Sequence, residues 1–197
     1  IWTENCAEDS YVAFRTTFTL EQAVPTATAF ISAADKYVLW VNGELVVLDG
    51  SLKRGPTPYD SYYDTVELTN LKQGENTIAL LVAFNGRSGG GSLVPVLVDE
   101  EGDEYTQAGL IFELDAGGTT ICSDSSWKAA RHTGYKNRVT AGADYPGYSQ
   151  SSMLAERNVY FDARDDLGDC MTEGYNDSEW EDATPVYKAG DLPFGDL

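Results

Sequence analysis

An Asn-Gly pair between two apolar runs is the feature that most constrains how this chain can fold. The stretch from Tyr37 to Leu48 places Asn42-Gly43 between residues that are almost all aliphatic or aromatic. Asn and Gly tolerate a positive φ, which the tight two-residue turn between paired strands requires. Because both runs are apolar almost throughout, we expect strands that are covered on both faces or lie deep in a sandwich. The pattern therefore predicts a buried hairpin that nucleates a β-sandwich.

Further short strands are predicted on both sides of this hairpin. Each is rich in β-branched, aliphatic or aromatic residues and is bounded by Gly, Pro, Asn or acidic turn residues. The predicted strands are 11–20, 26–33, 63–68, 76–84, 93–98, 109–114 and 119–122, with less regular candidates at 158–161 and 184–187. Many short strands separated by turns are typical of an all-β, antiparallel sandwich and not of a parallel sheet with crossover helices.

The 197 residues are predicted to form a single β-sandwich domain spanning 1–197. A globule of this size buries roughly 70% of its unfolded surface and needs no disulfide or metal to be stable. The predicted core covers about 10–130 and 158–190. Residues from about 131 to 157 are rich in Gly, Tyr and polar side chains without clear periodicity, so we expect an irregular excursion, with one helical turn near 151–156. An irregular, acidic C-terminal extension is expected to follow.

The charge balance excludes several classes of partner. Lys and Arg number 13 against 32 Asp and Glu, a formal net charge of −19. That field repels phosphate backbones and anionic membranes, so neither nucleic acid nor a membrane surface is an expected partner. Solubility of a secreted or cell-surface protein explains the acidity. A calcium site is the alternative, because Ca²⁺ prefers oxygen ligands.

One acidic cluster is the place where calcium would bind. Asp162, Asp165, Asp166 and Asp169 lie within eight residues, but the ligand spacing of an EF-hand loop is absent. A solvated acidic loop, with Asp162 paired to Arg164, accounts for the cluster without a metal. The metal question stays open at this point.

The cysteines and the single histidine point to no catalytic centre. Cys6, Cys122 and Cys170 show no Cys-x-x-Cys spacing, so zinc and redox motifs are unsupported. One disulfide with a leftover thiol and three free buried thiols are both compatible with this pattern. His132 lacks a Gly-x-Ser-x-Gly nucleophile motif elsewhere in the chain, and we expect a surface or loop histidine.

The stretch from Lys53 to Tyr63 is the most site-like, because it gathers charged and aromatic side chains on a predicted loop. Aromatic rings stack on the apolar faces of sugars, and charged groups form paired hydrogen bonds with hydroxyls. The loop after Phe84 would line the same rim if both loops lie at one end of the sandwich. The candidate carbohydrate-binding residues are Arg54, Tyr59, Asp60, Tyr62, Asn85 and Arg87. The alternative is that these side chains only pack and pair structurally.

An ordered series of short motifs resembles a known family. The series is Phe14-Arg-x-x-Phe18, Ala33-Ala-Asp-Lys-Tyr37, Val41-Asn-Gly43, Arg54-Gly-Pro56, Tyr63-Asp-Thr-Val-Glu-Leu68, Leu71-Lys-Gln-Gly-Glu-Asn-Thr-Ile-Ala79, Ser123-Asp-Ser-Ser-Trp127, Phe161-Asp-Ala-Arg164 and Tyr175-Asn-Asp-Ser-Glu-Trp-Glu-Asp-Ala183. It resembles the N-terminal, non-catalytic region of bacterial α-L-rhamnosidases of glycoside hydrolase family 78. The resemblance covers nearly the whole chain. Cys170 is a departure, since related sequences tend to have Trp there.

The resemblance implies a galactose-binding-like (jelly-roll) β-sandwich set ahead of a catalytic (α/α)6 barrel of the same polypeptide. The catalytic carboxylates of the family lie in that barrel, beyond Leu197, so no catalytic residue is carried over to this chain. The implied function is an accessory domain that packs against the barrel. The alternatives are a carbohydrate-binding module for rhamnose or plant glycans, with calcium as in some sandwiches of these enzymes, and a free-standing adhesion or structural protein.

Overall fold

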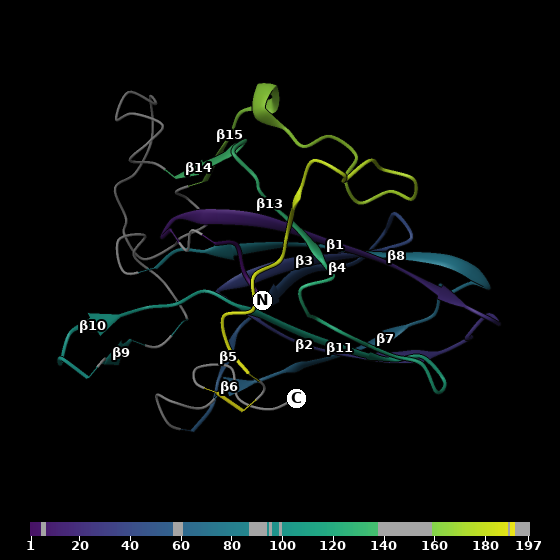
Figure 1. The fold of residues 1–197 in the computed structure, drawn as a ribbon, viewed down its shortest axis with the longest axis horizontal. Helices are drawn as coiled ribbons and strands as arrows, with labels where there is room; N and C mark the ends of the chain where they lie inside the picture. The colour runs from purple at the N-terminus through teal and green to yellow at the C-terminus, as the bar shows by residue number, and fades with distance from the viewer. Residues whose placement is uncertain are drawn as a thin grey trace.

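Two antiparallel sheets facing each other make up the body of the protein (Figure 1). The computed structural model describes residues 1–4, 7–56, 61–86, 94, 96–98, 100–137, 159–188 and 190–191. The larger sheet has six strands in the order β16 (Glu181–Asp182), β13 (Lys128–Arg131), β1 (Ser10–Leu20), β8 (Gly74–Phe84), β3 (Lys36–Val41) and β4 (Glu44–Ser51). The smaller sheet has four strands in the order β12 (Thr120–Cys122), β11 (Leu110–Asp115), β2 (Ala27–Ala33) and β7 (Asp64–Leu68). The all-β antiparallel sandwich predicted from the sequence is confirmed.

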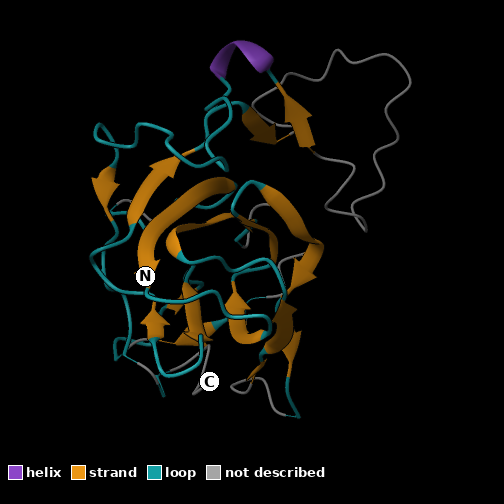
Figure 2. Cartoon of the chain, turned by 90° about the vertical axis from the view of Figure 1, so that its right-hand side faces the viewer, coloured by secondary structure: helices purple, strands orange, loops and turns teal. Residues whose placement is uncertain are grey.

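Among the described residues, three two-stranded ribbons and one short helical turn lie outside these sheets (Figure 2). The ribbons are β5 (Lys53–Arg54) with β6 (Ser61–Tyr62), β9 (Leu97–Val98) with β10 (Glu104–Tyr105), and β14 (Tyr135–Asn137) with β15 (Val159–Phe161). The turn is a 3-10 helix at Ala163–Asp165. Among the described residues, no helix has the length and apolarity that a membrane crossing requires.

The core lies between the two sheets and follows from the alternation of side chains along each strand. Val12 and Phe14 of β1 point inward, as do Leu80 of β8 and Phe112 of β11, and all four are at most 1% exposed. Two tryptophans complete the core. Trp2 packs on Phe14 with ring centroids 5.5 Å apart, and Trp127 packs on Phe112 at 5.3 Å. Burying one such large apolar side chain contributes about 1.5–3 kcal/mol.

The Asn42-Gly43 turn forms as predicted, but the hairpin around it is only half buried. Asn42 has φ 52° and Gly43 has φ 81°, the positive values that a tight hairpin turn needs. β3 alternates buried and half-buried residues, whereas β4 is the edge strand and exposes Leu45 at 51% and Leu48 at 70%. The prediction that both strands are buried is therefore wrong for β4, whose apolar residues also line the outward face of the sheet.

Three other expectations are corrected. The strand at 158–161 does not rejoin the sandwich; it forms β15 and pairs with β14. Arg131, expected at the start of the irregular region, is the last residue of β13 (Lys128–Arg131), which pairs with β1. The last strand of the described residues lies at 181–182 and not at 184–187. Asp182 and Glu181 pair there with Lys128 and Ala129, along the edge of β13 that β1 does not occupy. The predicted helical turn near 151–156 lies outside the described residues, and the domain boundaries stay a prediction.

The acidic C-terminal segment, residues 162–180, covers part of the outward face of the six-stranded sheet, around Arg15. Arg15 of β1 is 1% exposed on that face. Its Nε donates to Asp177 Oδ2 at 2.9 Å and its Nη1 to the carbonyl of Cys170 at 3.4 Å. The guanidinium also lies 5.8 Å from the ring centroid of Tyr175, a cation–π distance. One buried cation thus anchors the acidic segment to the sandwich.

Candidate functional site

Of the predicted carbohydrate-binding residues, only Tyr62 and Asn85 have described side chains. Tyr59, Asp60 and Arg87 lie outside the described residues. Arg54 is described as backbone only, in β5 opposite Ser61. Tyr62 is 58% exposed on β6, and Asn85 follows directly after β8. The predicted rim as a whole therefore stays a prediction. Asn85, however, lines a groove that lies within the described residues.

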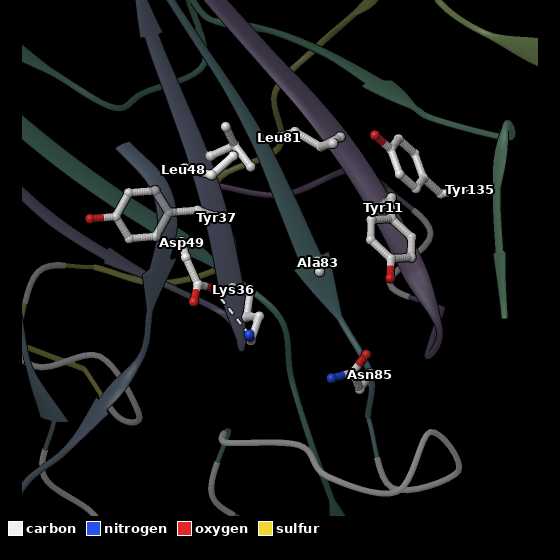
Figure 3. Close-up of a pocket in the computed structure, with 10 residues that line it drawn as sticks. Tyr11, Lys36, Tyr37, Leu48, Asp49, Leu81, Ala83, Asn85 and Tyr135 are labelled. Carbon is white, nitrogen blue, oxygen red and sulfur yellow. Dashed lines mark hydrogen bonds and ion pairs between the residues drawn. The ribbon is translucent and has the colours of Figure 1, made fainter. Parts of the chain in front are cut away.

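This groove lies on the outward face of the six-stranded sheet and encloses about 210 Å³ (Figure 3). Its floor consists of small and aliphatic side chains, Val38 of β3 with Leu81 and Ala83 of β8. These residues are neighbours because Leu81 pairs with Val38, and Ala83 with Lys36, across the two strands. They face outward because the alternate positions of both strands fill the core.

A pair of stacked tyrosines forms one wall of the groove. Tyr11 of β1 and Tyr135 of β14 have ring centroids 4.7 Å apart and planes inclined by 22°. Tyr135 is held from behind by His132 at 4.7 Å and by Phe161 at 4.9 Å. Burial, with the nearby Asp166 carboxylate, raises the pKa of Tyr135. The phenol is therefore neutral near pH 7 and available for hydrogen bonding.

Polar groups occupy the opposite wall and one end. Lys36 Nζ donates to Asp49 Oδ1 at 3.0 Å, and their side chains are 34% and 75% exposed. Asn85 lies at the end of the groove, where its backbone N–H donates to Asp35 Oδ2 at 2.7 Å. Asp35 is 1% exposed and also accepts from Val94 N at 3.3 Å. This buried carboxylate fixes the backbone at the open end of the groove.

Tyr37 holds the two strands beneath the charged wall together. Its ring lies against Gly50 of β4, where an added Cβ would overlap the ring. Its hydroxyl donates to Asp64 Oδ2 at 2.8 Å, and Lys53 pairs with the same carboxylate. Burial raises the pKa of Tyr37 to about 12. Only glycine at position 50 allows the aromatic ring to pass this close to the backbone.

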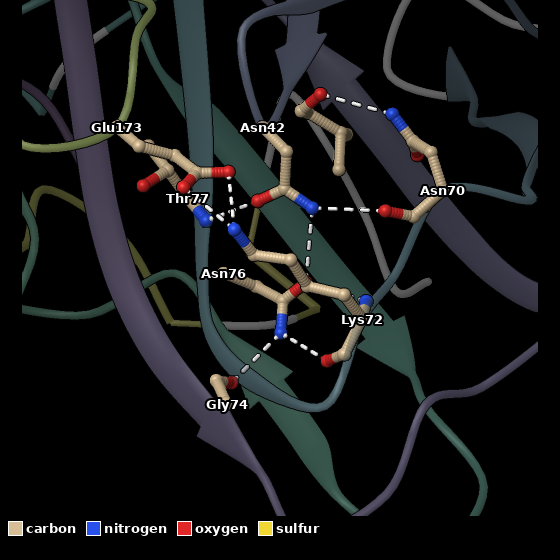
Figure 4. Close-up of polar contacts among 8 residues, drawn as sticks. Asn42, Asn70, Lys72, Gly74, Asn76, Thr77 and Glu173 are labelled. Atoms are coloured by element: carbon tan, nitrogen blue, oxygen red, sulfur yellow. Dashed lines mark hydrogen bonds and ion pairs between the residues drawn. The ribbon is translucent and has the colours of Figure 1, made fainter.

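At the far end of the same hairpin, three asparagines fix the turn (Figure 4). Asn42 Nδ2 donates to the carbonyl of Asn70 at 2.9 Å and to Asn76 Oδ1 at 3.0 Å, while Asn42 Oδ1 accepts from Thr77 N at 2.8 Å. Asn70 Nδ2 returns a bond to the carbonyl of Val41 at 2.9 Å. The network connects the β3–β4 turn to the chain that enters β8. It therefore helps to fix the register of β3 and β8, the two strands that form the floor of the groove.

The acidic cluster and His132 serve the structure. Asp162 accepts from Arg164 Nη2 at 2.6 Å and Nε at 2.9 Å, the pairing expected from the sequence. His132 lies in the loop after β13, one of the two expected positions, but it is only 6% exposed and so is not a surface histidine. Its Nε2 lies 3.3 Å from Asp166 Oδ1, and burial lowers its pKa despite that carboxylate. His132 follows β13 directly, and its ring centroid lies 4.7 Å from that of Tyr135 in β14 and 6.0 Å from that of Phe161 in β15.

Within the described part of the chain, no three His, Cys, Asp or Glu side chains lie close enough together to hold a metal ion. Cys122 and Cys170 are free thiols and Cys122 is exposed, so the alternative of three free buried thiols does not hold for that residue. Cys6 lies outside the described residues.

Sequence reasoning missed most of the groove. Lys36 and Asp49 lie on either side of the Asn-Gly turn, on the two strands of one hairpin. Their spacing from the turn places them across from each other near the base of the hairpin, so their contact could have been predicted from the sequence. Tyr11 and Tyr135 gave none, because their stacking depends on the position of a ribbon far along the chain.

The chain matches a family model described as the alpha-L-rhamnosidase N-terminal domain over residues 22–191. It is 27% identical over 178 residues to an alpha-L-rhamnosidase of Formosa agariphila, covering 85% of this chain and 17% of that protein.

Two solved structures share the fold. An alpha-L-rhamnosidase from Dictyoglumus thermophilum aligns with TM-score 0.63 and 22% identity, over 94% of this chain and 18% of the other. A Pleurotus ostreatus lectin in complex with GalNAc aligns with TM-score 0.55 and 22% identity, over 98% and 43%. The chain therefore spans less than half the length of each of these proteins.

Proposed function

Because the chain belongs to the alpha-L-rhamnosidase N-terminal domain family, we propose that it is a non-catalytic β-sandwich domain of an α-L-rhamnosidase-like glycoside hydrolase. Its proposed partner is a catalytic (α/α)6 barrel in the same polypeptide. The lengths of the relatives support this arrangement, since the matching region is 17% of one rhamnosidase and 18% of another. The domain would pack against the barrel and shape the rim of its active site.

The observation that carries this proposal is that the buried carboxylates are bound by other groups of the protein. Most glycoside hydrolases need two carboxyl groups facing an open site, roughly 5–10 Å apart. In the described residues the buried carboxylates are Asp35 and Asp162. Asp35 accepts from backbone N–H groups, and Asp162 is paired with Arg164. Asp49, in the groove, is paired with Lys36. These partners favour non-catalytic roles for all three carboxylates.

The β9–β10 ribbon is the surface we propose for the contact with the catalytic domain. Val96 is 42% exposed and Val98 is 59%, and the alternation of side chains places both on one face of the ribbon. An isolated two-stranded ribbon is only marginally stable in water, and apolar side chains gathered on one are commonly covered by a partner. Packing against a neighbouring domain would cover these side chains and stabilise the ribbon.

Comparing the longer natural polypeptide with the chain alone tests the non-catalytic role. The longer protein should release p-nitrophenol from p-nitrophenyl α-L-rhamnopyranoside, and residues 1–197 alone should not. Hydrolysis by the isolated chain would contradict the proposal.

Deletion of 1–191 from the longer protein should lower its thermal midpoint, and unchanged stability and activity would exclude a packing role.

A charge on the ribbon tests the contact surface. Val98→Asp should lower the thermal midpoint of the longer protein, because the carboxylate would be buried at the interface. The same substitution in the isolated chain is the control and should have little effect at a position 59% exposed. Equal effects in both proteins would exclude this ribbon as the contact.

Carbohydrate binding is the second candidate function. It is favoured by the groove, where stacked tyrosines and an apolar floor meet charged and amide side chains, the composition of many sugar sites. The Pleurotus ostreatus lectin with the same fold was solved with GalNAc. Rhamnose or plant glycans are the proposed ligands. The six rim residues predicted from the sequence, Arg54, Tyr59, Asp60, Tyr62, Asn85 and Arg87, remain candidates for a site of this kind.

A further inference from the structure

We propose that the groove on the outward face of the six-stranded sheet binds a single neutral pyranoside ring. This inference deepens the carbohydrate-binding function proposed above and rests on it. The groove draws on β1, β3, β4, β8 and β14, so most of its residues come from the central, best-paired strands. Sites on rigid strands hold their side chains more precisely than sites on loops.

The floor suits the apolar face of a sugar ring. Val38, Leu81 and Ala83 present only hydrocarbon to the groove. A pyranoside has one face on which C–H groups predominate, and this face loses little when it leaves water for an aliphatic surface. Leu48, on the adjacent edge strand, extends the same surface. The ring would therefore lie flat across β3 and β8.

The tyrosine pair limits where the ring can lie. Tyr11 and Tyr135 stack at 4.7 Å, and the rings of His132 and Phe161 support Tyr135 from behind. Rigid aromatic side chains contribute contact area at a low entropic cost. The phenol groups of this wall add hydrogen-bonding capacity at its edge.

The opposite wall matches two neighbouring hydroxyls. Lys36 Nζ and Asp49 Oδ1 lie 3.0 Å apart at the surface, an ammonium donor beside a carboxylate acceptor. One hydroxyl of a vicinal diol would accept from Lys36, and the next would donate to Asp49. The Asn85 amide, at the end of the groove, can serve a third hydroxyl as donor or acceptor.

Charge and size narrow the ligand class. The Lys36–Asp49 pair is neutral as a unit, and the chain carries −19, so acidic sugars are disfavoured. The volume of about 210 Å³ is below the range of roughly 300–1,000 Å³ for drug-sized ligands. One ring fits this space, with the rest of any longer glycan projecting outward.

Titration of the isotope-labelled chain, monitored by NMR, tests the groove. The probes are methyl α-L-rhamnopyranoside and methyl β-D-galactopyranoside, each added up to its solubility limit. At least one probe should produce saturable shifts of the methyl groups of Leu48, Leu81 and Ala83. Asp49→Asn and Lys36→Met should each weaken binding by about tenfold or more, because a charge-assisted hydrogen bond is lost. Both positions are at the surface, so the variants should keep the wild-type circular dichroism spectrum.

Glu173→Gln is the matched control, since it breaks an exposed ion pair with Lys72 outside the groove and should leave binding unchanged. The absence of saturable shifts in the groove with both probes would overturn the proposal. Loss of binding in Tyr62→Leu with full binding in Asp49→Asn would also overturn it, in favour of the loop at 53–63. Release of rhamnose from the probe by the chain alone would contradict the non-catalytic role only, because groove binding is measured separately by the shifts.

Discussion

Arg15 and Asp177, 162 positions apart in the sequence, form an ion pair with Nε–Oδ2 2.9 Å on the outward face of the six-stranded sheet. Their side chains are 2% and 27% exposed. Because Arg15 is enclosed, the acidic C-terminal segment is needed to satisfy a charge that β1 buries. The most acidic part of the chain thus has a specific structural partner.

Asp177→Ala should destabilise the chain by about 3 kcal/mol, since removing one partner leaves an uncompensated buried charge. The measurement is urea unfolding followed by tryptophan fluorescence. Glu173→Gln is the matched control in the same segment. Its partner is Lys72 at 2.6 Å, with both side chains more than 40% exposed, and such a surface pair contributes about 0–1 kcal/mol. Equal losses in the two variants would contradict the anchoring role of Arg15.

Asn42→Ala should lower the unfolding free energy by about 2–4 kcal/mol. The change removes three hydrogen bonds. It also places alanine, which has a Cβ but no polar side chain, at a φ of 52°. Asn42→Gly separates the two contributions. Glycine accepts the positive φ, so it should lose the hydrogen bonds but recover about 1 kcal/mol relative to alanine. Chemical denaturation of both variants measures the difference. An alanine variant as stable as the glycine variant would show that the turn carries no backbone strain.

The local features of this fold were predictable from the sequence, and the long-range ones were not. The Asn42-Gly43 turn and β8 depend on residues next to each other in the chain, so composition and alternation identified them. The edge position of β4 depends on which strand is last in the sheet, and no local pattern records strand order. Its apolar residues therefore gave the same signal as a buried strand would have given.

The candidate site shows the same limit. Asn85 was predicted because it follows a strong strand in a polar loop, and it does line the groove. Tyr11 and Tyr135 were not predicted, because their contact requires β14 to lie beside β1 and the intervening chain gives no periodic signal. A groove on a sheet face is assembled from alternate residues of several strands. Loop composition, on which the prediction rested, contains no information about it.

Tyr37 should make the chain lose stability at high pH. Its pKa is raised to about 12 from 10.0, so above pH 10 the unfolded chain loses the phenolic proton while the folded chain keeps it. The unfolded state then binds fewer protons, and the free energy of unfolding falls as pH rises from 10 to 12. In Tyr37→Phe this part of the pH dependence should disappear. Unfolding midpoints in urea across this range, compared between the two proteins, provide the measurement. Parallel pH profiles would contradict the assignment to Tyr37.

His132 should make the opposite contribution at mildly acidic pH. Burial lowers its pKa below 6.5, although Asp166 at 3.3 Å acts in the other direction. Below pH 6.5 the unfolded chain therefore binds a proton that the folded chain excludes, and stability falls as pH falls through the lowered native pKa. His132→Gln should remove this dependence, so the difference in unfolding free energy between wild type and variant should change with pH in this window.

Because the chain contains one histidine, a single imidazole signal reports its titration by NMR without ambiguity. A midpoint below 6.5 is expected. A midpoint above 6.5 would mean that the Asp166 carboxylate outweighs burial, and the histidine would then stabilise the chain as pH falls. The ring contacts Tyr135 at 4.7 Å, so Tyr135 resonances should shift with the same midpoint. That coupling would link the protonation state of a buried histidine to the aromatic wall of the groove.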